Sequence, residues 1–412
     1  NYRRIKMYYI DSTFEEPDIE YMKKRVLENL RGGIAVHDNT ELYNSILQAQ
    51  KAAAINMRNI YGIANPNSNV QLQTYLENNM DSNIEEACLI GDKLTTKKEA
   101  MQTLAHQGYQ FAIDLLTYRK AKKYAESLKS IMDYTVDGLV RPILSLGKTN
   151  RINYKEPALM NIPKKLLWNV IAPRNPDNIL VSVDIKNQEP WILINTLDIE
   201  VLKDKLNASD KDGLYNLIFE ELYGKVPTAL ERKELKTAWN ALTYGATKRG
   251  MMAMCKNFDG EKLYKFFNSI PEFKEYRSKC YAMARRKQQK VETYFGTELY
   301  ANELGNALQR VLMDLPIQGT GSDILALLIK HADEEIEDRG LEDYIDFYFS
   351  RHDELIFEVN GSWAKEVGLE RVYEELRDIM EHQVDDWEPF RVEIGIVEPE
   401  SVLDYGDDED EE

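Results

Sequence analysis

The sequence predicts an α+β protein in which long helical stretches separate a small number of strands. An apolar run at 179–183 ends in a carboxylate and is typical of a buried strand. Two aromatic and aliphatic runs, 344–350 and 355–359, lie on either side of a short polar turn and predict a β-hairpin. Residues 41–133 and 190–290 instead repeat apolar side chains every three to four positions, which favours amphipathic helices.

Length and composition limit the class of protein. A chain of 412 residues exceeds one ordinary hydrophobic core, so we expect two to four subdomains. No run approaches the roughly 18 apolar residues that span a bilayer, and the first residues lack a signal-peptide core. The cysteines, Cys88, Cys255 and Cys280, are far apart and match no metal-binding pattern. These features predict a cytoplasmic protein with reduced thiols and no membrane contact.

Charge leaves nucleic-acid binding open. The net charge of −18 disfavours phosphate contacts. Seven carboxylates, however, fall between Asp404 and Glu412, and we expect residues 405–412 to be a solvated acidic tail, with docking of a basic partner as the alternative. The basic residues also form local clusters: Arg119, Lys120, Lys122 and Lys123; Lys164 and Lys165; Arg232, Lys233 and Lys236; Lys248 and Arg249; Arg285, Arg286, Lys287 and Lys290. A basic cleft in an acidic body is therefore possible.

The first helical stretch has clear boundaries. Residues 1–40 form an N-terminal extension, which contains a predicted break at the glycine pair Gly32-Gly33. The helices that follow are interrupted at 65–68, where Ser68 or Asn69 is placed to cap the next helix. A region rich in Pro and Gly, 141–176, separates these helices from the first strand.

Two carboxylates stand where strands end. Asp184 closes the strand at 179–184, and Asp353 lies in the turn of the hairpin. If the two strands are neighbours in one sheet, these carboxylates can hold a pair of Mg²⁺ ions together with water and phosphate oxygens. The simpler alternative is that each aspartate only terminates its strand.

A polar stripe marks a helix in the second helical stretch. Thr228 and Glu231 form a capping box, so the helix begins near Ala229. Four side chains then recur every fourth residue on one side of it: Arg232, Lys236, Asn240 and Tyr244. The two cations are suited to a triphosphate, and the alternative is an ordinary solvated face. Farther along, the pattern predicts a helix broken at Pro316 and Gly319 and resumed to about Arg339.

Three segments in this order resemble the motifs of family A DNA polymerases, the enzymes built like bacterial DNA polymerase I. Residues 183–190, with Glu189 five positions after Asp184, are similar to the first palm motif of that family. The spacing from Arg232 through Lys236 to Tyr244-Gly245 resembles its fingers helix, and His352-Asp353-Glu354 resembles its last palm motif. Weaker similarity occurs at 149–151 and 157–163, at Arg310 and 316–320, and at 65–72 and 118–123, so the likeness covers roughly residues 41–400.

The resemblance implies a right-hand fold. Its parts would be a helical thumb at 41–140, an antiparallel-sheet palm at 141–194 and 291–404, and helical fingers at 195–290.

The resemblance also implies roles for particular residues. Those implied for metal binding and catalysis are Asp184, Asp353, the backbone carbonyl of Ile185, Glu354 as a support, and Lys236 as the group that protonates pyrophosphate. Those implied for the nucleotide are Arg232, Lys236, Tyr244, Asn240, and Glu189 as the residue that excludes ribonucleotides. Those implied for the primer–template are Arg151, Arg310, Gln318 and His352.

The activity implied by the resemblance is transfer of deoxynucleotides to a primer 3′-hydroxyl with two Mg²⁺ ions. Primer–template DNA and deoxynucleoside triphosphates would be the partners, with replication accessory proteins possible. Only about 40 residues precede the thumb-like region, so we expect no exonuclease domain in this chain. Abundant Lys, Asn, Ile and Tyr are typical of an AT-rich genome, and a phage enzyme working in host cytoplasm is one interpretation. A single-subunit RNA polymerase and a non-catalytic DNA-binding or assembly factor are the alternatives.

Four positions depart from the family pattern. Asn240 replaces an aromatic residue, Leu214 a phosphate-binding histidine, Trp191 an arginine, and Asp314 an asparagine. Three of them lie in the segments that resemble the fingers or the first palm motif, so we expect the nucleotide affinity, sugar discrimination and speed of this chain to differ from those of the family.

Overall fold

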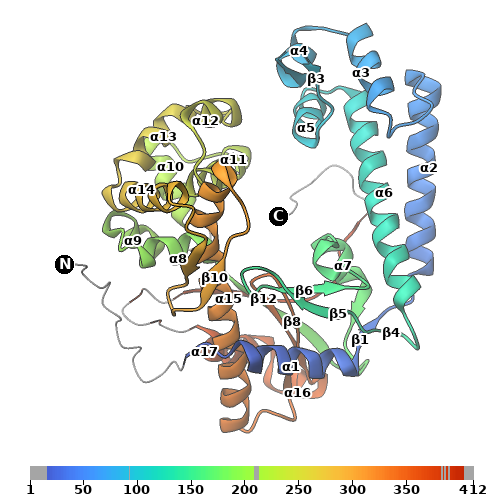
Figure 1. Ribbon diagram of the computed structural model, residues 1–412. Helices are drawn as coiled ribbons and strands as arrows, with labels where there is room; N and C mark the ends of the chain where they lie inside the picture. Colours follow the sequence, from blue (N-terminus) through green and yellow to red (C-terminus); the bar gives the residue numbers. More distant parts are fainter. Residues whose placement is uncertain are drawn as a thin grey trace. The chain divides into compact units, whose positions relative to one another are not determined.

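The computed structural model describes residues 16–91, 93–207, 213–381, 384, 387 and 390–402 (Figure 1). The predicted acidic tail and the first 15 residues of the N-terminal extension lie outside these residues. Contacts divide the chain into two compact units. One comprises Asn1–Arg31, Leu144–Asn153 and Asn175–Ile396; the other comprises Gly32–Ile143, Tyr154–Arg174 and Val397–Glu412. The thumb, palm and fingers boundaries given above stay predictions.

The unit built around residues 32–143 consists of two long helices with smaller elements at each end. Helices α2 (Thr40–Tyr61) and α6 (Gln110–Tyr134) run side by side (Figure 1). The predicted cap is confirmed, because Ser68 Oγ accepts a hydrogen bond from the Gln71 amide at 3.4 Å. The remaining elements of this unit are α3 (Asn69–Asn78), α4 (Ser82–Cys88), β2 (Leu89–Ile90), β3 (Lys93–Leu94), α5 (Lys98–His106), η1 (Leu159–Asn161), α7 (Lys164–Val170), and a sheet ordered β4 (Leu139–Val140), β1 (Ile34–Val36), β7 (Ile171–Ala172). A ribbon of β5 (Ile143–Leu146) and β6 (Ile152–Lys155) lies where the chain passes between the units.

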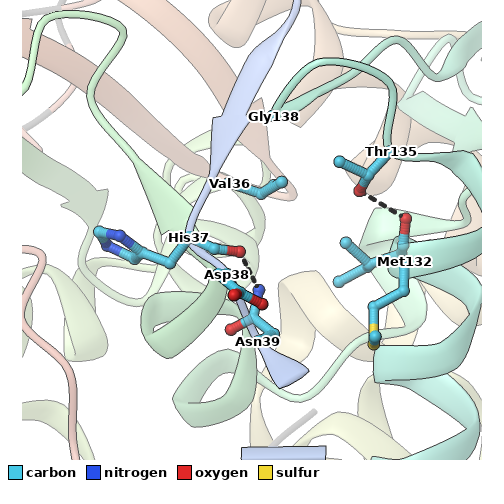
Figure 2. Close-up of a pocket in the computed structure, with 8 residues that line it drawn as sticks. Val36, His37, Asp38, Asn39, Met132, Thr135 and Gly138 are labelled. Carbon is cyan, nitrogen blue, oxygen red and sulfur yellow. Dashed lines mark hydrogen bonds between the residues drawn. The ribbon is translucent and has the colours of Figure 1, made fainter. Parts of the chain in front are cut away.

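A hollow of about 330 Å³ lies where β1 meets the ends of α2 and α6. Figure 2 shows Val36, His37 and Asp38 on one side and Thr135 on the other. The Asn39 side chain donates to the His37 carbonyl at 2.7 Å, and Thr135 donates to the Ile131 carbonyl at 2.8 Å. Two of the polar side chains that line the hollow are therefore engaged in local hydrogen bonds.

The other unit contains the sheet that carries the predicted acidic strand ends. Its strands lie in the order β11 (Ile345–Arg351), β12 (Glu354–Val359), β8 (Ile179–Ile185), β13 (Val392–Ile396), and every neighbouring pair is antiparallel. The hairpin predicted at the end of the chain is therefore confirmed. Its two strands are buried along nearly their full length.

Helices cover this sheet and form a separate group beside it. The group consists of α9 (Glu200–Asn207), α10 (Gly213–Tyr223), α11 (Ala229–Thr243), α12 (Lys248–Met254), α13 (Gly260–Ser269) and α14 (Pro271–Arg285) (Figure 1). Strands β9 (Lys290–Glu292) and β10 (Glu298–Tyr300) follow it. Around the sheet lie α8 (Gln188–Thr196), α15 (Gly305–Asp338), α16 (Gly361–Val367) and α17 (Leu369–Met380).

The predicted break at Pro316 and Gly319 is wrong, because α15 is one helix of 34 residues. Proline removes the amide that would bond to the Leu312 carbonyl. Helix α14 supplies donors at this point: Cys280 donates to the Leu312 carbonyl at 3.5 Å, and Tyr276 donates to the Met313 carbonyl at 2.7 Å. A tertiary contact from Cys280 thus satisfies the freed Leu312 carbonyl, and local sequence could not reveal that.

Helix α15 is also long and apolar enough to cross a membrane by length and composition. Its most apolar window is 83% buried inside the protein. Such burial is what a central core helix requires, and α15 occupies that position in this unit.

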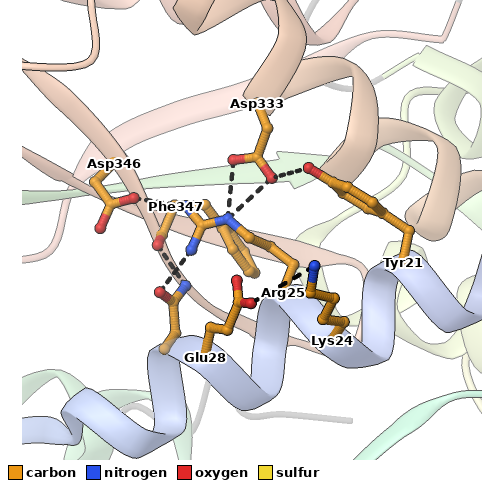
Figure 3. A network of polar contacts seen from close by, with 8 residues as sticks. Tyr21, Lys24, Arg25, Glu28, Asp333, Asp346 and Phe347 are labelled. Atoms are coloured by element: carbon orange, nitrogen blue, oxygen red, sulfur yellow. Dashed lines mark hydrogen bonds and ion pairs between the residues drawn. The ribbon is translucent and has the colours of Figure 1, made fainter.

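An N-terminal helix, α1 (Ile19–Gly32), is held against the edge of the sheet by a polar network (Figure 3). Arg25 lies between Asp333 of α15, at 2.9 Å, and Asp346 of β11, at 2.6 Å. Tyr21 donates to Asp333 at 2.9 Å, and Asn29 donates to the carbonyl of Phe347 at 2.6 Å, beside a bulge in this edge strand. Helix α1 thereby satisfies a backbone group on an otherwise open sheet edge.

Replacing Arg25 should weaken the fold measurably. Arg25→Met leaves the Asp333 carboxylate, whose side chain is only 18% exposed, without its cation. We expect a loss of about 2–4 kcal/mol in the free energy of unfolding, measured by urea denaturation. Lys24→Met is the matched control, because Lys24 is 77% exposed and its ion pair with Glu28 is long, at 4.0 Å. It should change stability by less than about 0.5 kcal/mol. Equal effects of the two substitutions would contradict the importance of the network.

Candidate active site

Two acidic strand ends lie side by side, as predicted. Antiparallel pairing sets Asp184 of β8 opposite Glu354 of β12. Asp353 occupies the two-residue turn just before β12, and its carbonyl accepts a hydrogen bond from the Ile185 amide at 3.5 Å. His352, the other turn residue, has a φ of +55° and an exposed side chain. Sheet pairing therefore brings together two aspartates that are 169 positions apart in the sequence (353 − 184).

Glu354 differs from its two neighbours in exposure. It is 2% exposed, whereas Asp184 and Asp353 are both half-buried. The Ser182 hydroxyl donates a hydrogen bond to the Glu354 carboxylate. This geometry agrees with a supporting position beside the site and does not present Glu354 to a ligand.

The electrostatic surroundings of Asp353 combine both signs of charge. Burial raises the pKa of Asp353, and the nearby Glu189 acts in the same direction. Arg151 and Lys236 oppose that shift. Two cations from distant parts of the sequence thus act on the carboxylate at the hairpin turn. Such a cation-flanked acidic site is suited to a ligand that carries both metal and phosphate.

The donor chemistry fits Mg²⁺ in part. Among the residues that the structure describes, no three His, Cys, Asp or Glu side chains gather as a metal-binding group. Mg²⁺ in phosphate-handling sites is commonly bound by one or two carboxylates, with water and substrate oxygens completing its shell. Asp184 and Asp353, with the neighbouring Ile185 backbone, could supply that protein share and leave the remaining positions to a substrate.

Helix α11 is built as its sequence indicates. Thr228 Oγ1 accepts from the Glu231 amide at 3.2 Å, and Glu231 accepts from the Thr228 amide at 2.9 Å, so the capping box is complete. Leu235 and Trp239 are buried on one side of the helix, and Trp239 packs edge-on to Phe267 at 4.7 Å. Packing of that side fixes the orientation of the polar stripe. Its members Arg232 and Asn240 are half-buried, Lys236 is exposed, and Tyr244 ends the helix as its C-cap.

Glu189 connects three segments of the chain. It lies in the first turn of α8, after Asn187, which adopts the left-handed conformation with a φ of +50°. Its carboxylate accepts from the Tyr244 hydroxyl at 2.5 Å and pairs with Arg151 at 3.0 Å. Burial, followed by the Glu189 charge, raises the pKa of Tyr244, so the phenol stays protonated and acts as a donor. The contact expected between Glu189 and Tyr244 is present, whereas the ion pair with Arg151 was not anticipated.

The other predicted DNA-contacting residues lie on α15. Arg310 is exposed, and Gln318 is half-buried two positions after Pro316. The unbroken helix holds both side chains on one rigid element. Their role remains a prediction.

Two of the four departures are accounted for by packing. Leu214 is 1% exposed within the helical group, so this position offers nothing to a phosphate. Trp191 is 3% exposed and meets Trp387 edge-on at 4.9 Å and Phe390 at 5.4 Å. An apolar aromatic contact thus occupies the place of a charged side chain.

Sequence inspection missed the surroundings of two carboxyl groups on α15, the fully buried Asp323 and the half-buried Asp314. Asp323 is fully buried and accepts from Thr293 at 2.5 Å and from Thr297 at 3.0 Å. Burial raises the pKa of Asp323 to about 6, although both hydroxyls oppose the shift. Asp314 had been noted only as a departure from the family pattern. Burial, reinforced by Glu189, raises the pKa of Asp314 to about 6, with Arg151 opposing. No sequence pattern signals either partner set, because the partners come from remote segments.

Comparison with known proteins gives consistent matches. The model of DNA polymerase family A matches residues 37–398. DNA polymerase I of Mycobacterium tuberculosis H37Rv is 24% identical over 392 residues, covering 85% of this chain and 41% of that protein. The Rhizobium leguminosarum DNA polymerase I is 25% identical over 295 residues, covering 64% of this chain and 28% of that protein. The chain thus spans less than half the length of these relatives.

One solved structure has a similar fold. It is described as the POL domain of Pol1 from M. smegmatis in complex with DNA primer-template and dNTP. Its TM-score to this chain is 0.75 at 21% sequence identity, and the match covers 92% of this chain and 69% of that one. The predicted α+β, right-hand fold class is confirmed by this likeness.

Proposed function

Because the chain belongs to DNA polymerase family A, with residues 37–398 matching the family model, we propose that it is a template-directed DNA polymerase. It would add deoxynucleotides to the 3′-hydroxyl of a primer. The observation that carries the proposal is that Asp184, near the end of β8, lies beside Asp353, in the turn just before the neighbouring strand β12, with Arg151 and Lys236 acting on Asp353. This is the arrangement that nucleotidyl transfer with metal ions requires.

The acidic strand ends would hold two Mg²⁺ ions through Asp184, Asp353 and the Ile185 carbonyl. When bound, such ions activate the attacking hydroxyl and neutralise charge on the transferred phosphate. Buried Glu354, fixed by Ser182, would support the turn that carries Asp353.

The stripe on α11 would bind the triphosphate. The Arg232 guanidinium would bind phosphate oxygens as a fork and Lys236 as a point charge. Lys236 would also transfer a proton to the leaving pyrophosphate. Asn240 would face the sugar, and Tyr244 would pack beside Glu189 at the sugar C2′ position.

Four residues would contact the primer–template: Arg151, Arg310, Gln318 and His352. The minor groove presents purine N3 and pyrimidine O2 acceptors for every Watson–Crick pair. Donors such as Arg310 and Gln318 therefore sense pair shape without selecting a sequence, as a copying enzyme requires.

Primer extension tests the function directly. Wild-type protein, a labelled primer–template, Mg²⁺ and four deoxynucleotides should give full-length product. Ribonucleotides alone should give far less. Extension without a primer, at equal rates with ribonucleotides, would favour an RNA polymerase. Absence of extension despite DNA binding would favour a non-catalytic DNA-binding protein.

Glu189→Ala should relax the selection against ribonucleotides. Removing the carboxylate opens space beside the sugar and leaves Tyr244 and Arg151 without their acceptor. We expect the ratio of kcat/KM for deoxynucleotide over ribonucleotide to fall by about 10–200-fold. Glu275→Ala is the control, because Glu275 is 67% exposed and its ion pair with Lys279 lies on the surface of α14. An unchanged ratio in Glu189→Ala would remove Glu189 from the sugar site.

A further inference from the structure

The end of helix α11 presses directly on α15. Gly245 has a φ of +88°, which favours glycine, and a Cβ added there would lie 2.5 Å from Met313 Cε, so the Met313 side chain would have to shift. From the other side, the Tyr276 hydroxyl donates a hydrogen bond to the Met313 carbonyl at 2.7 Å. Met313 is thus fixed between two helices, and the adjacent residues, Tyr244 and Asp314, are brought to the same place.

Two carboxyl groups surround the single hydroxyl of Tyr244. The observed hydrogen bond goes to Glu189 Oε2 at 2.5 Å. Asp314 is also close enough for the Tyr244 hydroxyl to lower its pKa. Within the part of the chain that the structure describes, Asp314 Oδ1 is buried and has no hydrogen-bond partner. One cation, Arg151, faces both carboxyl groups and is already paired with Glu189 at 3.0 Å.

We propose that Asp314 is a specificity-determining positioning residue, whose carboxylate competes with Glu189 for the Tyr244 hydroxyl. A phenol has one proton and can donate one full hydrogen bond at a time. Ionised Asp314 offers a second acceptor and weakens the bond from Tyr244 to Glu189. Protonated Asp314 is a poor acceptor and can donate to the Tyr244 oxygen, so the bond to Glu189 is then complete.

The switch between these arrangements should lie near neutral pH. The groups that face Asp314 are Glu189 of α8, Arg151 before β6, Tyr244 of α11 and Tyr276 of α14. Burial and Glu189 raise the pKa of Asp314 to about 6, while Arg151 and the Tyr244 hydroxyl limit the rise. Below that pH the Tyr244 hydroxyl donates its hydrogen bond to Glu189 alone. Above it, Glu189 and Asp314 compete for that hydrogen bond.

The consequence for selectivity rests on the proposed function, in which Glu189 and Tyr244 exclude the ribose 2′-hydroxyl. At low pH the complete hydrogen bond from Tyr244 holds Glu189 more rigidly beside the sugar, so ribonucleotides should be excluded better. The ratio of kcat/KM for deoxynucleotide over ribonucleotide should therefore fall by about threefold to tenfold between pH 5.5 and 8, the equivalent of one neutral hydrogen bond. General effects of pH on the enzyme cancel, because both substrates are measured at each pH.

Asp314→Asn is the decisive variant. The amide has the same shape, carries no charge and can donate from Nδ2, so it imitates the protonated acid. In this variant the ratio of kcat/KM for deoxynucleotide over ribonucleotide should stay at the low-pH value of the wild type from pH 5.5 to 8. Asp323→Asn is the matched control, since Asp323 is a second buried carboxyl on α15 with its pKa raised to about 6, but it is bound to Thr293 and Thr297. That variant should keep the wild-type pH dependence.

Thermal unfolding gives a readout independent of activity. A carboxyl whose pKa is raised in the folded state costs stability as pH rises from the unfolded value near 4 to about 6. The midpoint of Asp314→Asn should thus exceed that of wild type increasingly over this range and level off above it. A wild-type ratio that does not change with pH, or a pH-independent ratio in Asp323→Asn, would overturn the proposal. Failure of wild type to extend any primer would instead overturn the proposed function.

Discussion

Asp353→Asn should reduce primer extension by about 1,000-fold or more, while the protein stays folded. The substitution keeps the shape of the side chain but removes the charge that would bind a divalent ion at the hairpin turn. Metal stabilisation of a phosphoryl transition state contributes several kcal/mol, and each 1.4 kcal/mol is tenfold in rate. Asp184→Asn, on the adjacent strand, should have an effect of similar size. Single-turnover primer extension measures both.

The control is Asp343→Asn. Asp343 is an exposed residue shortly before β11, so its substitution makes the same chemical change in the same hairpin region. Its extension rate should stay within about twofold of wild type. Unfolding curves and DNA binding, recorded in parallel, separate lost catalysis from lost structure. If Asp353→Asn folds and retains more than a tenth of the activity, the carboxylate pair is not the catalytic centre.

Local sequence was sufficient wherever short-range chemistry decides the structure. The capping box at Thr228 and Glu231 is present, and the Ser68 cap was correctly placed. Near-continuous apolar runs identified the strand that carries Asp184 and the hairpin at 344–359, because strands that are buried on both faces need apolar side chains at nearly every position. From these two elements the proximity of Asp184 and Asp353 could be anticipated.

Sequence failed where the deciding group lies far along the chain. Pro316 predicted a broken helix, but Cys280 of another helix donates to the Leu312 carbonyl that Pro316 leaves without its helix donor. The two donors to Glu189, Arg151 and Tyr244, lie 93 residues apart in the sequence (244 − 151), and no local pattern links them. Helix α1 precedes the family match at residue 37, yet its Arg25 is held by two carboxylates. Side-chain partners of this kind become visible only after folding.

Lys236→Ala should lower kcat by about 100- to 1,000-fold. Its ammonium acts on Asp353 and lies on the stripe that faces the proposed triphosphate. Loss of a proton donor to a leaving group typically costs about 10²–10⁴ in rate. Lys279→Ala, a 63% exposed lysine on α14, should leave the rate nearly unchanged. Pre-steady-state extension with saturating deoxynucleotide isolates this effect from binding.

Lys236→Arg distinguishes the two functions assigned to this side chain. The guanidinium retains the positive charge and can still bind phosphate, but it does not release a proton at any working pH. If Lys236 is a proton donor, this variant should keep KM for the nucleotide within a few-fold and still lose most of kcat. If Lys236 only binds phosphate, Lys236→Arg should recover kcat to near the wild-type value. That recovery would remove the proton-transfer role and leave α11 as a phosphate-binding helix alone.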